Sequence, residues 1–114
     1  MDSFEILQKG VNAWNAWRKD NPGIQPVFEG KIIKNLNLEK AELYRSKFIN
    51  CQIVASNFYG AIINRAEIIN TRIDNSIFCN SDFFGAKISD SEINHSDFSK
   101  IEIEESVESD EPDE

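Results

Sequence analysis

Every fifth residue from Phe28 to Ile103 is Phe, Ile or Leu, without an exception. The residue two places before each of these positions is usually small, namely Ala, Ser, Cys or Thr. We call the apolar positions of this register the centre positions, and they are Phe28, Ile33, Leu38, Leu43, Phe48, Ile53, Phe58, Ile63, Ile68, Ile73, Phe78, Phe83, Ile88, Ile93, Phe98 and Ile103.

A period of five suits neither a straight α-helix nor an uninterrupted strand. In an α-helix every fifth side chain is rotated by about 140°, which spreads the apolar residues around the helix. In a strand an odd period places successive apolar side chains on opposite faces. A short extended side followed by a bend satisfies the period, and four such sides close a coil of twenty residues. Repetition at a short fixed period is typical of a solenoid.

The register therefore predicts a solenoid of about four coils, in which centre residues twenty positions apart stack in ladders. The ladder of Leu38, Phe58, Phe78 and Phe98 is nearly all Phe, so its rings are expected to stack at the spacing of paired strands, about 4.8 Å. Gly and Asn recur where the bends fall, and these residues tolerate unusual backbone angles. In the first coil Lys31 and Leu36 replace the small residue, which predicts a distortion or a partly open corner there.

Residues 3–19 are predicted to form one amphipathic helix. Phe4, Leu7, Val11, Trp14 and Trp17 follow helical spacing on one face. Asp2 or Ser3 is suited to cap the helix, and Asn21-Pro22-Gly23 ends it. The Trp-rich stripe is interpreted as core packing rather than as a ligand site. The helix is placed to cover the N-terminal end of the solenoid, which would otherwise expose its apolar interior.

The repeats resemble the pentapeptide-repeat family. Ala41-Glu42-Leu43, Ser56-Asn57-Phe58, Ser81-Asp82-Phe83 and Ser96-Asp97-Phe98 carry the resemblance best, which covers about residues 27–103. It implies a right-handed quadrilateral β-helix. The segment Asn-Ala-Trp-Asn-Ala-Trp-Arg, followed by Asn21-Pro22, is similar to one seen ahead of such repeats in bacterial members of the family.

Charge divides the chain into a balanced body and an acidic end. The net charge is −8, but eight acidic residues lie from Glu102 onward and no basic residue does. The expected organisation is a capping helix and linker over residues 1–25, the β-helix over 26–105 and a disordered acidic tail over 106–114. No signal peptide is apparent, no stretch approaches the roughly 20 apolar residues of a membrane span, and two cysteines are too few for a disulfide framework. These features predict a cytoplasmic protein.

The sequence contains no recognisable catalytic, cofactor-binding or metal-binding motif, so we expect a non-enzymatic protein without cofactors. His95 is the only histidine and falls at a bend. Cys51 is expected in an inward slot, whereas Cys79 is expected to face outward, and these opposite orientations argue against a disulfide between them. The outward columns mix charges of both signs, as in Lys47, Glu67 and Lys87, which argues against direct nucleic-acid binding.

Some outward positions are apolar and are candidates for a protein interface. These residues are Tyr44, Ile49, Tyr59, Ile62, Ile69, Ile77 and Phe84. Aligned apolar groups on a surface can mark an interface, and the alternative is that they only pack against each other along the solenoid.

The favoured function is a protein-interaction or scaffold module whose partner is an unidentified protein. The register ends at Ile103 without an evident cap. Either this end joins a second copy in an end-to-end homodimer, or Val107 and its neighbours fold over it. The family resemblance implies an alternative, a DNA-mimicking inhibitor of DNA gyrase or topoisomerase. The neutral body and a rod of only about 19 Å for four coils disfavour that alternative.

Overall fold

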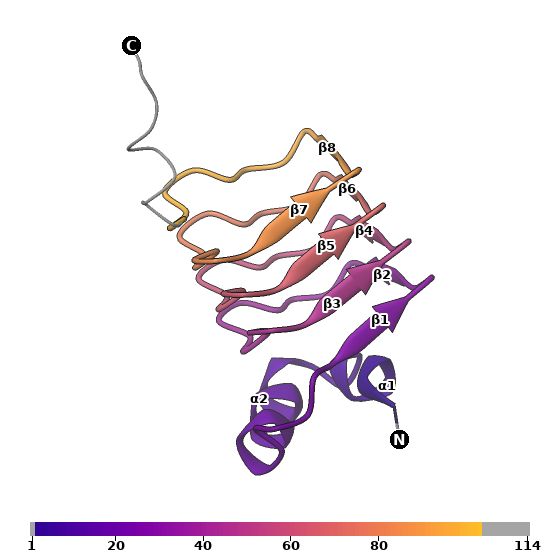
Figure 1. Cartoon of the computed structure of the whole chain (residues 1–114), viewed down its shortest axis with the longest axis vertical. Coiled ribbons are helices and arrows are strands. Elements are labelled where there is room, and N and C mark those ends of the chain that lie inside the picture. Colours follow the sequence, from indigo (N-terminus) through magenta and orange to yellow (C-terminus); the bar gives the residue numbers. More distant parts are fainter. Residues whose placement is uncertain (1, 104–114) are drawn as a thin grey trace.

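The computed structural model describes residues 2–103, which form a four-sided parallel β-helix with two helices at its N-terminal end (Figure 1). One side carries a parallel sheet of four short strands, and the next side carries a second such sheet. The first sheet contains β1 (Val27–Glu29), β3 (Lys47–Ile49), β5 (Glu67–Ile69) and β7 (Lys87–Ser89). The second contains β2 (Ile32–Lys34), β4 (Gln52–Val54), β6 (Arg72–Asp74) and β8 (Glu92–Asn94).

The predicted twenty-residue register is confirmed. Phe28 pairs with Phe48, which pairs with Ile68, and Ile68 pairs with Ile88. Isolated parallel bridges give the same spacing on the other two sides. The β-helix therefore has four stacked coils, which we call levels, and three complete turns link them. We call the sides the β1 face, the β2 face, the Asn57 face (through the bridges at positions 37, 57, 77 and 97) and the Ile62 face (through positions 42, 62, 82 and 102).

Every corner of the β-helix uses a left-handed residue. From position 30 to position 100, each fifth residue has a positive φ between 50° and 73°. A single residue in this conformation reverses the chain direction sharply, which lets each side be only a few residues long. Asn and Gly occupy many of these corners, as the sequence predicts, and the remainder include Ala55, His95 and several Lys and Arg residues.

Small side chains at the corners make hydrogen bonds along the helix axis. The Ser76 hydroxyl accepts from the Ser56 amide one level earlier, at 3.2 Å, and donates to the Asp74 carbonyl at 3.0 Å. Thr71 does the same between the Cys51 amide and the Ile69 carbonyl. These bonds explain why Ser and Thr are frequent in the columns that follow the strands.

Aromatic stacking fills one ladder of the interior. The rings of Phe58 and Phe78 are 4.5 Å apart at 5°, and those of Phe78 and Phe98 are 4.7 Å apart at 6°. The predicted Phe ladder is therefore confirmed. Such offset stacking adds to the apolar burial itself.

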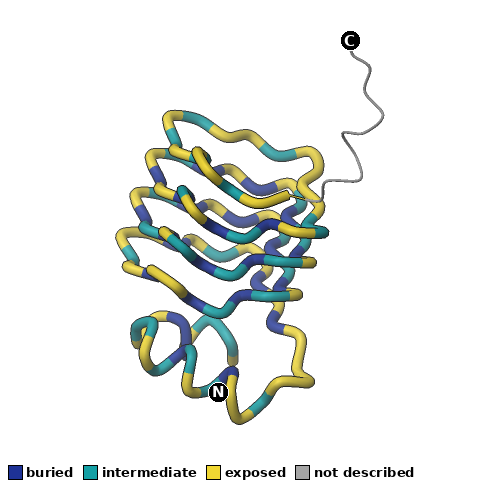
Figure 2. Tube along the Cα trace, turned by 90° about the vertical axis from the view of Figure 1, so that its left-hand side faces the viewer, coloured by how far each residue is buried: buried dark blue, intermediate teal, exposed yellow. Residues whose placement is uncertain are grey.

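Centre residues are buried at the first three levels but not at the last (Figure 2). From Phe28 to Phe83 each centre side chain is at most 3% exposed. At the last level Ile88 and Ile93 are 42% exposed and Ile103 is 60% exposed. The cause is geometric, because no further level lies above these side chains among the described residues.

The N-terminal segment forms two helices, so the prediction of one continuous helix is wrong. α1 spans Ser3–Leu7 and α2 spans Val11–Asp20. Gly10 separates them with a φ of 108°, a conformation that a helix does not contain. The predicted cap is present, since the Glu5 amide donates to Asp2 Oδ1 at 2.9 Å.

The strand pairing of the first coil shows no distortion, whereas Leu36 borders a shallow hollow at its corner. β1 and β2 pair with β3 and β4 in the regular register, despite Lys31 and Leu36. No coil lies beneath these two residues, so larger side chains fit there. The Lys31 ammonium lies 5.3 Å from the centroid of the Phe4 ring in α1, and Leu36 packs against the core. The predicted tail over 106–114 lies outside the described residues.

Candidate interaction surface

The candidate interface residues lie on three different faces and do not form one patch. Ile49 and Ile69 are direct neighbours on the β1 face and are half-buried. Tyr59 and Ile77 lie on the Asn57 face. The remaining three, Tyr44, Ile62 and Phe84, belong to the Ile62 face, where Phe84 is 45% exposed. Their role as an interface stays a prediction.

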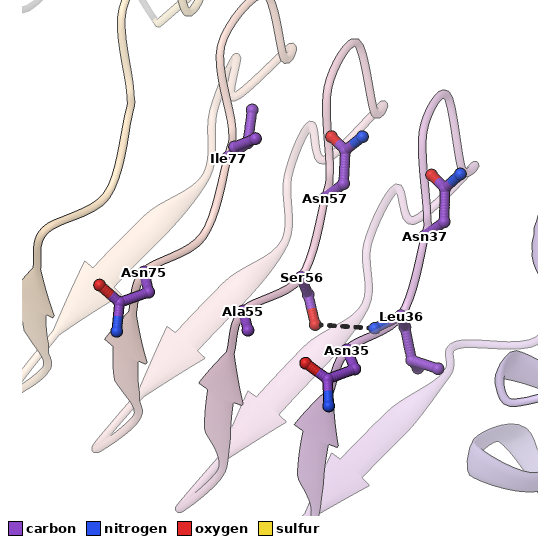
Figure 3. Close-up of a pocket in the computed structure, with 8 residues that line it drawn as sticks. All are labelled: Asn35, Leu36, Asn37, Ala55, Ser56, Asn57, Asn75 and Ile77. Atoms are coloured by element: carbon purple, nitrogen blue, oxygen red, sulfur yellow. Dashed lines mark hydrogen bonds between the residues drawn. The ribbon is translucent and has the colours of Figure 1, made fainter.

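The Asn57 face carries two shallow hollows. A shallow depression of about 490 Å³ lies beside Asn57, and Figure 3 shows the residues that line it: Asn35, Leu36, Asn37, Ala55, Ser56, Asn57, Asn75 and Ile77. A second depression of about 350 Å³ is lined by Glu39, Asn57, Tyr59, Ile77, Cys79 and Asp97. Asn57 and Ile77 line both, so the two hollows flank one column of side chains. Both are wide open to solvent, unlike an enclosed small-molecule site.

Hydrogen bonds hold the polar side chains of this face in place. Asn57 Oδ1 accepts from the Tyr59 amide at 2.9 Å, and Asn37 Oδ1 accepts from the Glu39 amide at 3.2 Å. Figure 3 shows the side chains of Asn37 and Asn57 lying parallel to each other on successive levels. Asn80 Nδ2 donates to the Tyr59 hydroxyl at 2.7 Å. The face therefore presents fixed amide groups next to exposed Ile77.

The cysteines and the histidine do not come together. Cys51 is buried, its thiol donates to the Phe28 carbonyl at 3.1 Å, and burial raises the pKa of that thiol. Cys79 is half-buried in the second hollow, and both cysteines are free. His95 is exposed at a corner, as the sequence predicts. Within residues 2–103 no group of His, Cys, Asp and Glu is arranged to hold a metal ion.

Hydrogen bonds from Ser99 perturb one carboxylate beside the second hollow. The Ser99 hydroxyl and amide both donate to Asp97 Oδ1, at 2.7 and 2.9 Å, and they lower the pKa of that exposed carboxyl. The pKa falls because both hydrogen bonds stabilise the ionised carboxylate relative to the protonated acid. The two bonds span only two residues of the chain, so they close a local turn around Asp97.

The sequence predicts that the Trp-rich helix covers this end of the β-helix, but not the hydrogen bonds through which α2 does so. Trp14 Nε1 donates to the Glu42 carbonyl at 2.8 Å, and Asn15 Oδ1 accepts from the Glu42 amide at 2.8 Å. The buried Arg18 guanidinium donates to the carbonyls of Glu42, Ile24 and Tyr44, at 3.2, 2.8 and 2.9 Å. Its carbon Cζ lies 3.9 Å from the centroid of the Tyr44 ring.

These side chains replace a missing coil. At later levels, the amide of position 62 bonds to the carbonyl of position 41, and the carbonyl of 62 accepts from the amide of 43. At the first level the equivalent groups are the amide and the carbonyl of Glu42, which have no preceding coil to bond to. Asn15 accepts from this amide, and Trp14 and Arg18 donate to this carbonyl. The signal in the sequence is the unusual clustering of Trp, Asn and Arg on one helix, but only the docked geometry shows its use.

No helix within residues 2–103 has the length and apolar character required to cross a membrane.

Comparison with known proteins finds similarity to solved structures only. No known family model matches the chain, and no curated protein does. Eight solved chains match. One is a pentapeptide repeat protein from the Arabidopsis thaliana thylakoid lumen, with 14% identity, a TM-score of 0.37, and coverage of 61% of this chain and 60% of that one. Another is QnrB1, a plasmid-mediated fluoroquinolone resistance protein, with 13% identity, a TM-score of 0.31, and coverage of 68% and 74%.

These similarities are too low to assign a function, and the chain spans less than two thirds of the Arabidopsis structure. The fold is established by the chain itself, through its strand pairing, its corners and its stacked centre residues. A five-residue register therefore builds a four-sided parallel β-helix in this chain.

Proposed function

We propose that this protein is a non-enzymatic protein-interaction or scaffold module. The observation that carries the proposal is the apolar cross-section at the C-terminal end of the described β-helix, where Ile88, Ile93 and Ile103 are 42%, 42% and 60% exposed. Aligned exposure of this kind is rare on a monomeric surface. β7 and β8 also have no neighbouring strand on their outer edge among the described residues, and such edges favour association.

The proposed partner at this end is a second copy, joined end to end. The same apolar cross-section and strand edges would meet across a twofold axis, which suits a self-complementary contact. Light scattering across a concentration series tests this proposal on the full chain. We expect dimers for the natural sequence and monomers for Ile93→Glu.

Ile32→Glu is the matched control, because Ile32 is 56% exposed on the outer surface of the first level. It makes the same chemical change far from the proposed contact, so dimerisation is expected to persist. A natural chain that stays monomeric at high concentration contradicts the homodimer. Affinity capture with Ile77→Glu then tests whether the Asn57 face binds a different protein.

The hollows of the Asn57 face are shallow and wide open to solvent, unlike an enclosed substrate site, and this supports a non-enzymatic role. Cytoplasmic location belongs to the same proposal, supported by two free cysteines. Inhibition of DNA gyrase is the competing function. It is not favoured, because residues 2–103 carry twelve basic and thirteen acidic side chains and so lack the strong negative charge of DNA. A supercoiling assay separates the two, and inhibition at micromolar protein would favour DNA mimicry.

A further inference from the structure

One corner of the β-helix collects basic side chains. Arg45 and Arg65 are exposed at successive levels of the corner between the Ile62 face and the β1 face. Lys47 and Lys87 lie just beyond it on the β1 face, on either side of Glu67. We call Arg45, Arg65, Lys47 and Lys87 the basic corner. Among the described residues none of the four lies within ion-pair distance of a carboxylate.

At the basic corner, the side chain of Arg65 extends toward the C-terminal end of the described chain. The column continues from Arg65 to Gly85, and a Cβ atom placed on Gly85 would lie 3.3 Å from Cγ of Arg65. The stem of Arg65 therefore lies against Gly85, one level closer to that end. Glycine leaves the space that this stem occupies. Exposed Phe84 adjoins the same position.

Acidic residues continue the sequence directly after the last described residue, Ile103. Glu102 pairs with Asp82 on the Ile62 face, so the described chain ends at Ile103, on the side of the β-helix that leads to the corner of Arg45, Arg65 and Gly85. Seven of the eleven residues of 104–114 are acidic and none is basic. Arg45 is three levels away, or about 14 Å at the spacing of paired strands. Eleven residues reach up to roughly 36 Å, which is more than enough.

We propose that the basic corner is a docking site for an acidic peptide segment, and that its occupant is residues 104–114 of the same chain. The short connection holds the segment at a millimolar effective concentration, so even a weak contact between exposed charges is populated. Partners with acidic segments then compete with the chain's own end for this surface. The contact lies on the side of the β-helix and does not depend on the proposed end-to-end dimer.

Paramagnetic relaxation in the full chain tests the proposal. A spin label is attached to Ser109→Cys in a Cys79→Ser background, since Cys51 is buried. We expect the amide signals of Arg45 and Arg65 to lose at least half of their intensity. Those of Lys40 and Gly60, at the same levels on the other corner of the Ile62 face, should lose clearly less. The difference should vanish in Arg45→Glu/Arg65→Glu and in about 0.5 M salt, where the Debye length falls below about 5 Å.

The matched control is Lys40→Glu/Lys100→Glu. These two lysines are exposed, occupy left-handed corners with φ of 62° and 58°, and give the same change in charge. This variant should keep the broadening at Arg45 and Arg65. If Arg45→Glu/Arg65→Glu does not fold, Glu104→Gln/Glu105→Gln/Glu108→Gln tests the same contact without altering the β-helix.

Three results would overturn the proposal. The first is equal broadening at both corners, and the second is broadening that persists after charge reversal of the basic corner. The third is broadening that appears only when spin-labelled chains are mixed with separate isotope-labelled chains, because the segment would then dock on a second copy.

Discussion

Left-handed corners are the main conformational cost at the level of single residues. Among residues 2–103, twelve non-glycine residues adopt a positive φ, from 50° at Asn70 and His95 to 64° at Arg45. This conformation brings Cβ close to the following carbonyl and costs roughly 1–2 kcal/mol for most residues, less for Asn. Hydrogen bonds to a neighbouring level offset this cost, as at Ala55, whose amide donates to the Asp74 carbonyl at 3.0 Å.

Relief of this strain is measurable at Ala55. Its φ is 51° and its side chain is exposed, so Ala55→Gly is expected to raise the free energy of unfolding by about 0.5–1 kcal/mol. Denaturant unfolding measures the change. The same substitution at Ala16, exposed in α2, should lower stability by about 1 kcal/mol, since glycine weakens a helix interior. Destabilisation by both would mean that the corner carries little strain.

The two thiols are expected to differ in reactivity. Burial raises the pKa of Cys51 and reduces its thiolate fraction at neutral pH, whereas Cys79 is partly accessible. Ellman's reagent should therefore react quickly with one thiol per native chain and with two in denaturant. Cys79→Ser should remove the fast reaction. A fast reaction that survives in Cys79→Ser would show that Cys51 is accessible through opening of the β-helix.

At the scale of elements, α2 acts as a substitute coil made of side chains. It satisfies the backbone of the first level through groups that a strand would normally supply, with Arg18 alone bonding to three carbonyls. Burial lowers the pKa of Arg18, and the nearby Tyr44 and Glu42 oppose that shift. A buried guanidinium held by carbonyl dipoles is costly to disturb, because each acceptor left unpaired keeps its desolvation penalty.

Removing this guanidinium should destabilise the whole protein. Arg18→Met keeps much of the side-chain volume but orphans the carbonyls of Ile24 and Tyr44, so we expect a loss of about 2–4 kcal/mol. Thermal or denaturant unfolding measures it. Lys19→Met, exposed on the same helix, should change stability by less than about 0.5 kcal/mol. Equal effects of the two variants would contradict a capping role for Arg18.

The β-helix follows from the sequence, because its inward positions obey one repeated rule, as Phe48, Ile53, Phe58 and Ile63 illustrate. The break at Gly10 was harder to foresee, since the apolar stripe continues across it. The bonds of Arg18 depend on how α2 docks, which no local pattern encodes. The outward residues are the least predictable, because Tyr59 and Phe84 are free of the packing constraint that fixes their inward neighbours.

At the scale of the whole molecule, the protein is a one-dimensional stack whose levels contact only their neighbours. Stability in such a stack is close to a sum of level and interface terms, and an uncovered end opens more easily than the middle. The N-terminal end is covered by α1 and α2, while the centre residues of the last described level remain exposed. Fraying should therefore begin at that last level.

Hydrogen exchange distinguishes fraying from end-to-end association in one experiment. The amides of Lys87, Glu92 and Asp97 bond to the previous level, as do those of Glu67, Arg72 and Ile77 one level earlier. In dilute protein we expect the first group to exchange roughly tenfold or more faster, because only the last level must open. Raising the concentration should slow exchange in the first group and leave the second nearly unchanged, since a second copy would cover the exposed end. Ile93→Glu should abolish this concentration dependence. If the exchange rates of the last level do not change with protein concentration in the natural sequence, the end-to-end homodimer is contradicted.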